Sequence, residues 1–365
     1  MSDVLARTLG HLERLVGFDT RNPPRAIDGD GIFNYLRGAL TPAGFACVTT
    51  VLGDGCVYLL ATRGDPSLLI NVHIDTVPAD PGWTADPLRL VVDGEKATGL
   101  GACDIKGAAA CLLAVAAETR GPAALLFSSD EEAGSSRCIR SFLGVHGFAE
   151  VVVAEPTQCA AVCEHRGIGS AVYAFSGIGG HASAARALQD SAIHEAVRWA
   201  GRALEHAATA ECGLGWLRGL RLNLGVIEGG VKSNMIAAAA SVRVGVRPPP
   251  ELGPLAALEQ LRGLAPDLAR VRLTPTFLAP PLPACGREGL VAARRGAAAL
   301  AERLKLPAGP PVDFWTEAAL FSEAGAAALV FGPGDIAQAH TAGEWVALAD
   351  LATAAEAYRR MLSGG

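Results

Sequence analysis

The amino-acid sequence predicts an α/β protein in which a mixed-sheet domain carries a smaller, inserted α+β domain. Before residue 166, short apolar runs alternate with helical segments, which is typical of strands buried on both faces of a parallel or mixed sheet. After residue 166 the expected order becomes strand, helix, two strands, helix and strand, which is the ferredoxin-like arrangement. A chain of 365 residues is long enough for two domains of ordinary size.

The larger domain is expected to begin with an amphipathic helix, for which Ser2 or Asp3 would be the cap. Three buried strands are expected at residues 68–72, 123–128 and 151–154, and one helix at residues 105–119. In sheets of this kind, ligands bind beyond the carboxyl ends of the strands. Acidic or histidine residues stand at these ends, so we expect the functional site there.

The inserted domain is expected to contain the ferredoxin-like set of elements. These are strands at 168–176, 220–228, 237–246 and 270–277, and helices at 182–208 and 251–263. A proline-rich stretch at 278–283 would link this domain back to the larger one. The remaining elements are helices at 287–304 and 348–362 and a strand at 326–331. The predicted boundaries are therefore 1–166 with 279–365 for the catalytic domain, and 167–278 for the insertion.

Composition and charge argue against several classes of protein. The formal net charge is −6 and there is no basic tract, which argues against nucleic-acid binding. No apolar stretch reaches the roughly 18–20 residues that span a bilayer, and charges interrupt the apolar clusters of the N-terminus, unlike a signal peptide. The nine cysteines are odd in number and scattered, which favours reduced thiols. We therefore expect a cytoplasmic protein without a nucleic-acid or membrane partner.

Five short motifs rich in acidic residues and histidine each follow an apolar run. They are N-V-H-I-D-T-V-P, G-A-C-D-I-K-G, S-S-D-E-E-A, V-A-E-P-T and A-Q-A-H-T, which start at residues 71, 101, 128, 153 and 337. Imidazole and carboxylate groups are ligands of divalent metals such as zinc. Together the motifs supply enough of these groups for two divalent metal ions and a general base.

Each motif also has an ordinary structural interpretation. His73 and Asp75 face the same way at a strand end, where Asp75 could hold the second ring nitrogen of a metal-bound histidine or merely cap a turn. Asp104 could be a plain helix N-cap. Glu131 and Glu132 could form a solvated turn, whereas a metal ion would offset their repulsion and leave one carboxylate free as a base.

The last two motifs are equally ambiguous when each is taken alone. Glu155 could be an exposed carboxylate at a strand end, and a lone histidine such as His340 is more often structural than a ligand. Five independent coincidences in one chain are nevertheless harder to explain than one metal centre.

In this order, the motifs resemble those of the zinc-dependent aminoacylase and carboxypeptidase family that includes acetylornithine deacetylase and succinyl-diaminopimelate desuccinylase. The resemblance runs essentially from end to end. It implies a catalytic domain of the zinc exopeptidase type and an inserted domain that acts as a lid and joins two subunits into a homodimer.

The resemblance also implies a role for each motif. The ligand sets would be His73, Asp104 and Glu155 for one metal ion, and Asp104, Glu132 and His340 for the other. Asp104 would bridge the two ions, Glu131 would be the general base and Asp75 would orient His73. The peptide bond between Asp104 and Ile105 is expected to be cis. Zinc fits these ligands, and cobalt would substitute for it.

Further residues match positions at which the family binds its substrate. They are His181, Asn234, Arg247, Thr316 and Gly332, with Arg166 as a weaker candidate. His181, in S-G-I-G-G-H-A-S, would reach the active site of the partner subunit and stabilise the oxyanion, and Ser183 could cap the following helix. Arg247 and Asn234 would contact the α-carboxylate of the substrate.

Some of these positions keep an alternative interpretation. His181 could be a loop histidine before a helix, and Arg166 could be a hinge arginine paired with a surface acid. Glu317 stands where relatives often have aspartate after threonine, so its role is open.

The implied reaction is hydrolysis of a small N-acyl amino acid. Likeness in F-D-T-R-N-P-P-R, C-D-I-K-G-A-A-A, S-S-D-E-E-A, V-D-F-W-T-E-A and G-P-G-D-I-A-Q-A-H-T-A favours an acetylated citrulline over an acetylated ornithine, although no residue is assigned to the side chain. A desuccinylase, dipeptidase or carboxypeptidase could use the same site, and a non-catalytic binding protein could share the fold. The presence of every matched ligand and of Glu131 argues against the non-catalytic alternative.

Overall fold

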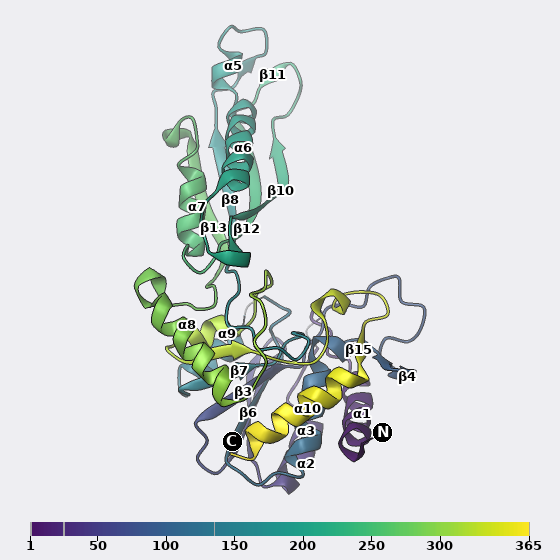
Figure 1. The fold of residues 1–365 in the computed structure, drawn as a ribbon. Coiled ribbons are helices and arrows are strands. Elements are labelled where there is room, and N and C mark those ends of the chain that lie inside the picture. Colours follow the sequence, from purple (N-terminus) through teal and green to yellow (C-terminus); the bar gives the residue numbers. More distant parts are fainter. Residues whose placement is uncertain (1, 25, 135, 365) are drawn as a thin grey trace. The chain divides into compact units, whose positions relative to one another are not determined.

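The computed structural model describes residues 2–24, 26–134 and 136–364, which form two compact units (Figure 1). The first unit comprises Met1–Cys163, Ala293–Gly309 and Thr316–Gly365, and the second comprises Glu164–Ala292 and Pro310–Trp315. The second unit is thus formed mainly by one internal segment of the chain, as expected for an insertion.

The first unit is built on a six-stranded mixed sheet in the order β1-β2-β6-β3-β7-β14. Its strands are β1 (Ala46–Gly53), β2 (Cys56–Arg63), β3 (Leu68–His73), β6 (Ala123–Ser128), β7 (Glu150–Val153) and β14 (Ala327–Val330). The strands β6, β3, β7 and β14 are parallel, whereas β2 pairs antiparallel with both β1 and β6. The carboxyl ends of the four parallel strands therefore meet at one edge of the sheet.

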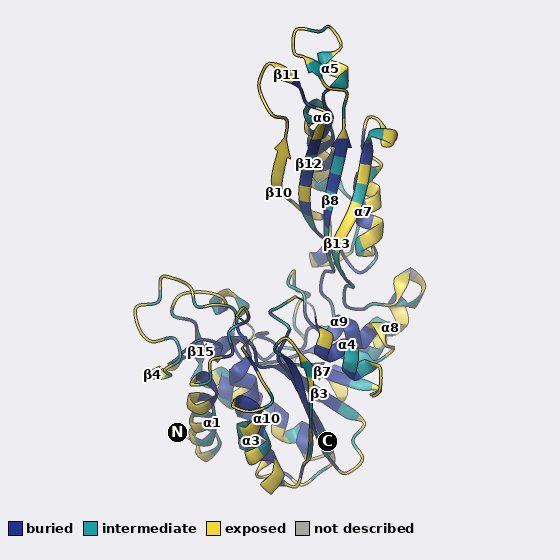
Figure 2. Ribbon diagram, turned by 180° about the vertical axis from the view of Figure 1, so that it is seen from behind, coloured by how far each residue is buried: buried dark blue, intermediate teal, exposed yellow. Residues whose placement is uncertain are grey.

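Helices cover this sheet and bury its central strands, which appear dark blue in Figure 2. The helices are α1 (Asp3–Val16), α2 (Ile32–Leu40), α3 (Gly107–Ala116), α4 (Arg137–Leu143), α9 (Ala318–Glu323), α10 (Leu348–Leu362) and the C-terminal part of α8 (Gly286–Arg303). Every residue of α3 is buried, because α1 and α10 pack against it and its small alanine side chains allow close approach. The predicted cap of α1 is confirmed, since the Ser2 hydroxyl accepts from the Leu5 N–H at 3.3 Å.

A small three-stranded sheet, in the order β15-β5-β4, adjoins the region of the motifs. Its strands are β4 (Val91–Asp93), β5 (Lys96–Thr98) and β15 (Trp345–Ala347). Short helical turns, η1 (Thr41–Ala43), η2 (Ala102–Lys106) and η5 (Ile336–Gln338), complete the unit. Because β15 pairs with β5, the segment after His340 lies beside the segment that leads to Asp104.

The second unit contains a four-stranded antiparallel sheet in the order β10-β12-β8-β13, with α6 and α7 on one face (Figure 1). Its elements are β8 (Ile168–Ser176), β9 (Gly180–His181), α5 (Ala187–Asp190), α6 (Ala192–Thr209), η3 (Gly215–Leu217), β10 (Arg221–Gly229), β11 (Met235–Ile236), β12 (Ala239–Arg247), α7 (Pro254–Arg262), η4 (Leu268–Arg270) and β13 (Val271–Ala279). Trp199 of α6 packs on Tyr173 of β8, with ring centroids 4.4 Å apart. The predicted fold class, including the ferredoxin-like order, is confirmed.

One predicted helix begins later than expected, after the motif that contains Asp104. Residues Asp104 and Ile105 have φ/ψ values of −120°/89° and −142°/30°, so regular helix starts only at Gly107. The peptide bond between Asp104 and Ile105 is cis, as the resemblance implied. Asp104 is therefore not a plain N-cap.

The helix expected from residue 182 also begins later, at Ala192. Its cap is Ser191, which is extended at φ −70° and ψ 123° and whose hydroxyl accepts from the His194 N–H. Ser183, the expected cap, instead pairs through its hydroxyl with His181. Among the described residues, no helix is both long and apolar enough to cross a membrane, and none of the nine cysteines forms a disulfide.

Candidate metal and active site

The motif residues gather where the parallel strands of the first unit end. His73 is the last residue of β3, and Glu155 follows two residues after the end of β7. The loop after β6 carries Glu131 and Glu132. Since β3 pairs in parallel with both β6 and β7, these side chains start from neighbouring positions at the same edge of the sheet.

A first group of possible metal ligands consists of His73, Asp104 and Glu155. Their ligand atoms all lie within 4.8 Å of one another. The His73 Nε2 atom is 3.1 Å from Asp104 Oδ1 and 3.8 Å from Glu155 Oε2. All three residues are buried, with exposures of 2%, 6% and 5%.

A second group consists of Asp104, Glu132 and His340. The His340 Nε2 atom lies 2.9 Å from Glu132 Oε1 and 3.4 Å from Asp104 Oδ2. Asp104 thus turns its Oδ1 atom to the first group and its Oδ2 atom to the second. One carboxylate with an oxygen in each group has the geometry of a bridging ligand.

The His73 ring is oriented from the side opposite to Asp104. Its Nδ1 atom lies 3.1 Å from the main-chain oxygen of Asp75 and 3.5 Å from the Asp75 carboxylate. That carboxylate in turn accepts hydrogen bonds from the Asn22 side-chain amide at 3.1 Å and from the Glu132 N–H at 3.0 Å. Asp75 therefore links the first group to the loop that carries Glu132.

Asp130 holds the same loop from its other side. Its buried Oδ2 atom accepts from the main-chain N–H groups of Arg137 at 2.5 Å and of Cys138 at 3.2 Å, at the start of α4. The Ser136 side chain at the cap position of α4 makes no capping hydrogen bond. Asp130 thus satisfies the helix N-terminus and anchors the two glutamates that follow it.

The glutamates of the site are difficult to ionise because of their surroundings. For Asp104, burial acts to raise the pKa, but hydrogen bonds to His340 and His73 hold it below its usual value. Burial raises the pKa of Glu131 well above its usual value; the charge of Glu155 adds to this, while that of His73 opposes it. Burial likewise raises the pKa of Glu155 to about 8, with a further contribution from the charge of Asp104. These groups therefore sit in a region of excess negative charge and low solvation.

The pKa values of the two histidines are raised as well, which favours their charged forms. Hydrogen bonds to Asp104 and Glu132 raise the pKa of His340 to about 10. Burial acts to lower the pKa of His73, but the charge of Glu155 and hydrogen bonds to neighbouring carboxylates hold it well above its usual value. A site that attracts protons in this way also favours divalent cations, and its nitrogen and carboxylate oxygen donors are those that zinc binds. The donor set therefore fits a pair of divalent metal ions.

The predicted residues Thr316 and Gly332 also belong to the first unit. Thr316 is buried and its hydroxyl accepts from the Ala318 N–H at 3.3 Å. Gly332 packs so tightly on Glu155 that an added Cβ would lie 2.6 Å from the Glu155 carbonyl oxygen. Gly332 therefore supports the main chain of a candidate ligand.

Glu317, whose role the sequence leaves open, is completely buried. Its Oε2 atom accepts from the Asn71 side-chain amide at 2.9 Å and from the Ser128 hydroxyl at 3.2 Å. Asn71 lies in β3 and Ser128 ends β6, so Glu317 joins the two strands that lead to His73 and to the glutamates. Burial raises the pKa of Glu317 to about 8.

The other predicted substrate residues belong to the second unit. His181 in β9 lies opposite Met235 in β11, and the Ala182 N–H donates to the Asn234 carbonyl at 3.1 Å, so His181 and Asn234 are close neighbours. His181 is exposed, and its Nδ1 atom is 2.7 Å from the Ser183 hydroxyl.

Arg247 and Arg166 differ in how their guanidinium groups are used. Arg247 is half-buried, donates to the carbonyl of the adjacent Val246 and has a pKa lowered by burial. Arg166 is fully buried and pairs with Asp313 at 2.5 Å. Arg166 also donates to the carbonyl oxygens of Gly219, Arg247 and Arg218 at 2.7, 3.2 and 3.3 Å. This geometry favours the hinge interpretation of Arg166. The guanidinium of Arg247 can still donate hydrogen bonds to an anionic partner.

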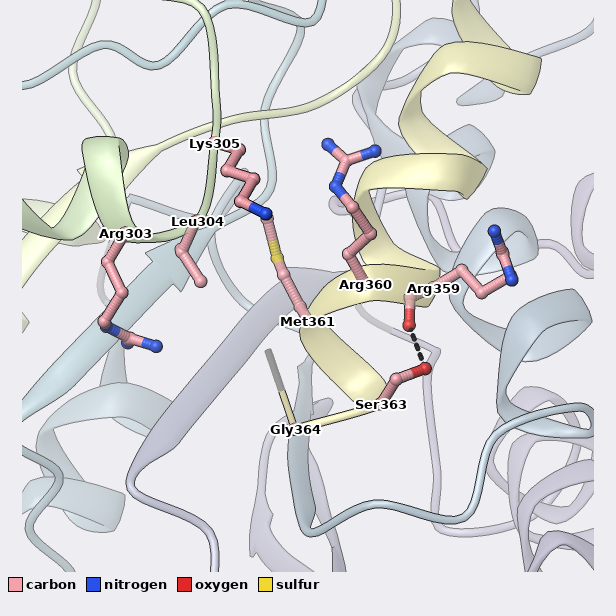
Figure 3. Close-up of a pocket in the computed structure, with 8 residues that line it drawn as sticks. All are labelled: Arg303, Leu304, Lys305, Arg359, Arg360, Met361, Ser363 and Gly364. Atoms are coloured by element: carbon pink, nitrogen blue, oxygen red, sulfur yellow. Dashed lines mark hydrogen bonds between the residues drawn. The ribbon is translucent and has the colours of Figure 1, made fainter.

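A surface pocket of about 370 Å³ lies between the C-terminal ends of α8 and α10 (Figure 3). It is lined by Arg303, Leu304, Lys305, Arg359, Arg360, Met361, Ser363 and Gly364. The cations stand at helix C-termini, where they complement the helix dipoles. The pocket shares no residue with the two ligand groups, so its volume alone does not make it the active site.

Similarity to known proteins shows the family of the chain. Residues 69–364 match the family model of peptidase family M20/M25/M40. The chain belongs to this family. It is 50% identical to N-acetyl-L-citrulline deacetylase of Xanthomonas campestris pv. campestris over all of both chains. It is 32% identical to acetylornithine deacetylase of Myxococcus xanthus, with 96% of this chain and 95% of the relative covered.

Solved structures of peptidases share the fold. A tripeptidase of Staphylococcus aureus superposes with a TM-score of 0.72 at 17% identity, covering 98% of each chain. A dinuclear metal binding peptidase of Bacillus subtilis superposes with a TM-score of 0.70 at 15% identity, covering 99% of this chain and 98% of the other. The arrangement of a mixed-sheet unit with a separate antiparallel unit is therefore that of the M20 peptidases.

The sequence alone assigned no role to several residues that support the candidate metal site. Asn22, Asp130 and Glu344 are buried and hydrogen-bond to residues in or beside the ligand groups. Glu344 had the clearest signal, since a lone acid four residues after His340 in a short loop needs a partner once it is buried. Asn22 lies far from its partners in sequence, so spacing could not reveal it.

Proposed function

We propose that this M20 protein hydrolyses N-acetyl-L-citrulline to L-citrulline and acetate, as a step of arginine biosynthesis. The observation that carries this proposal is the identity of 50% to N-acetyl-L-citrulline deacetylase over the full length of both chains, against 32% to an acetylornithine deacetylase. N-acetyl-L-ornithine is the second candidate substrate, because that relative also matches nearly the whole chain.

The two ligand groups would hold two divalent ions, for which we propose zinc or cobalt. His73, Asp104 and Glu155 would bind one ion, and Asp104, Glu132 and His340 would bind the other. Bound there, such ions would polarise the amide carbonyl and make a water molecule more acidic. The clustering of imidazole and carboxylate ligand atoms within 4.8 Å of one another in each group supports this occupancy.

Glu131 is proposed as the general base. It follows Asp130, which anchors the loop, and precedes Glu132, which belongs to the second ligand group. Glu131 would take the proton from the attacking water and then donate it to the nitrogen of the leaving amine. The partly buried setting, in which desolvation raises the pKa of Glu131, suits a group that must both accept and release a proton.

The second unit is proposed to supply the residues that bind the substrate. Arg247 would pair with the α-carboxylate, because a half-buried guanidinium favours a carboxylate partner. Asn234, which lies beside His181 and not beside Arg247, is the other residue proposed for that contact. His181 of the partner subunit would donate a hydrogen bond to the oxyanion. Thr316 and Gly332, in the first unit, would lie near the metal ligands and contact the substrate there. Arg166 would act only through the main chain of Arg247.

The enzyme is proposed to be a homodimer in which residues 167–278 form the lid and dimerisation domain. In the described sheet, β10 pairs only with β12 and so leaves one edge open. Val226 and Ile227 on this strand are 38% and 54% exposed. An apolar edge strand of this kind is a template for pairing with the same strand of a second copy.

Parallel measurement of kcat/KM for four substrates tests the proposed reaction. Metal-loaded protein is offered N-acetyl-L-citrulline, N-acetyl-L-ornithine, N-succinyl-diaminopimelate and a dipeptide. We expect N-acetyl-L-citrulline to be hydrolysed fastest. Equal or inverted rates for the two acetyl substrates would reject the citrulline assignment, and metal binding without hydrolysis of any substrate would indicate a binding protein.

A further inference from the structure

Glu344 lies in the loop between His340 and β15, and only 2% of it is exposed. Its Oε1 atom accepts hydrogen bonds from the main-chain N–H groups of Cys103 and Asp104, and its Oε2 atom accepts one from Gly101. All three donor–acceptor distances are 2.9 Å. With three hydrogen bonds from one side chain, Glu344 fixes the main chain that carries Asp104.

The main chain of Glu344 joins the same two segments. The Gly99 N–H donates to the Glu344 carbonyl at 3.0 Å, and the Glu344 N–H donates to the Thr341 carbonyl at 3.2 Å. Directly after Glu344, Trp345 of β15 pairs with Thr98 of β5. The loop with His340 and the loop with Asp104 are therefore tied together at Glu344.

The segment that Glu344 holds has little room to shift. Gly101 has a φ of 77°, and a Cβ added there would lie 2.6 Å from Thr76 Cγ2. The Cys103 thiol donates to the Asp335 carbonyl at 3.3 Å, which adds a contact from the loop before His340. The main chain of residues 101–104 is thus enclosed by neighbouring loops, and the three N–H groups in it depend on Glu344 for their acceptor.

We propose that Glu344 is a positioning residue that sets the geometry of the second ligand group. This role, which rests on the metal-dependent function proposed above, follows from which ligands Glu344 controls. In the second group it holds the main chain of Asp104 and the loop of His340, two of the three ligands. In the first group it holds Asp104 alone. Loss of Glu344 therefore weakens binding of the second metal ion more than binding of the first.

Stepwise zinc binding to the metal-stripped, full-length protein tests this role. Wild type, Glu344→Gln and Glu344→Ala are titrated with Zn²⁺ in equilibrium dialysis. For Glu344→Ala we expect affinity for one of the two ions to fall by about 10–100-fold, the usual effect of losing a group that orients a ligand. The zinc affinity of Glu344→Gln should lie between those of Glu344→Ala and wild type. Its amide oxygen can still accept hydrogen bonds from the Cys103 and Asp104 N–H groups, but its NH₂ group would face the Gly101 N–H and could not accept from it.

Two further variants show which of the two zinc-binding steps is affected and control for the loss of a glutamate. His340→Ala removes a ligand of the second group only, so Glu344→Ala should weaken the same binding step. Glu356→Gln alters an exposed glutamate of α10 that pairs with Arg359 and Arg360, and should bind both ions as wild type does. With acetylated substrate, the Glu344 variants should lower kcat more than they raise KM.

The possible results separate this role from the function on which it rests. If wild type binds no zinc, the metal-dependent function fails. If wild type binds two ions but Glu344→Gln binds both as tightly, or loses both equally, Glu344 does not position the second group. Should Glu344→Ala fail to fold, as judged by circular dichroism of the metal-free protein, the Gln variant decides by the same criteria.

Discussion

The two units hold their candidate functional residues in different ways. In the first unit, His73 and Asp104 are buried and bound to several partners, so their positions are fixed before any ligand arrives. In the second unit, His181 is exposed and pairs with Ser183 two residues away, and Arg247 donates to the carbonyl of its own neighbour. The first set is preorganised for a cation, whereas the second set retains donors that a substrate can use.

This difference indicates that metal binding belongs to the first unit and substrate binding to the second. A cluster of acids with raised pKa values destabilises the folded protein unless a cation is bound. We therefore expect this cluster to serve metal-dependent hydrolysis whichever substrate is bound. Exposed donors on a separate unit cost little and can vary with the substrate. Mutations in the first unit should therefore affect metal binding or the chemical step, and those in the second unit should leave metal binding unchanged.

The largest effect is expected for Glu131→Gln. The amide is similar in size but cannot accept the proton of the attacking water, so kcat should fall by about 10²–10⁴-fold. Because Glu131 is not a member of either ligand group, both metal ions should still bind. The measurements are kcat on N-acetyl-L-citrulline and zinc stoichiometry by equilibrium dialysis.

Glu132→Gln is the matched comparison, since Glu132 is the next residue and belongs to the second ligand group. This variant should lose affinity for one ion. If Glu131→Gln retained nearly wild-type kcat, the general base would have to be another residue; if it lost metal instead, Glu131 would be a ligand.

A somewhat smaller effect is expected for His181→Ala in the second unit. Removing one donor to an oxyanion typically lowers kcat by about 10²–10³-fold. Zinc affinity should be unchanged, in contrast to variants of the ligand groups. Ser183→Ala is a useful control, because it removes the partner of the His181 ring without removing the donor, and should have a much smaller effect on kcat.

Mixed dimers test whether His181 acts on the partner subunit. His181→Ala subunits keep intact ligand groups, and Glu131→Gln subunits keep His181. If active sites are shared between subunits, a mixture of the two inactive variants should recover activity through the composite site of the mixed dimer. Recovery would not occur if each subunit used its own His181, because every site would then lack one of the two groups.

Much of the fold was predictable because buried parallel strands have a strong sequence pattern. The strand at Ala123–Ser128 and the helix at Leu348–Leu362 lie where the apolar pattern placed them. The errors arose where local backbone geometry overrides propensity. Asp104 and Ile105 leave the helical region of φ/ψ space, and the single helix expected from residue 182 is replaced by turns, the short helix α5 and then α6, which starts only after Ser191.

The candidate site was predictable to the extent that its residues stand at strand ends. His73 and Glu155 converge because β3 and β7 are parallel neighbours. The residues that support the site could not be predicted in this way. Glu317, for example, is 246 residues from its partner Asn71. A contact of this kind depends on the tertiary arrangement, and no periodicity in the chain encodes it.

The smallest effect is expected for Glu317→Gln, and it concerns stability. The folded-state pKa of Glu317 is about 8, above the ordinary glutamate value of 4.5, because the side chain is buried. Between these two pH values the folded protein keeps a proton that the unfolded chain releases. The free energy of unfolding should therefore decrease as pH rises through this window, by at most about 1.4 kcal/mol per pH unit for this one group.

In Glu317→Gln this contribution disappears, because the amide mimics the protonated acid and its oxygen can still accept from Asn71 and Ser128. Urea unfolding of the metal-free proteins at several pH values from 5 to 8 measures the difference in slope. Glu155, whose pKa is also about 8, is retained in the variant, so the slope should become shallower without becoming flat. Glu356→Gln, on the exposed face of α10, should leave the slope unchanged. Identical slopes in wild type and Glu317→Gln would mean that Glu317 is ionised across this range, and the buried support of the first unit would then carry one more negative charge.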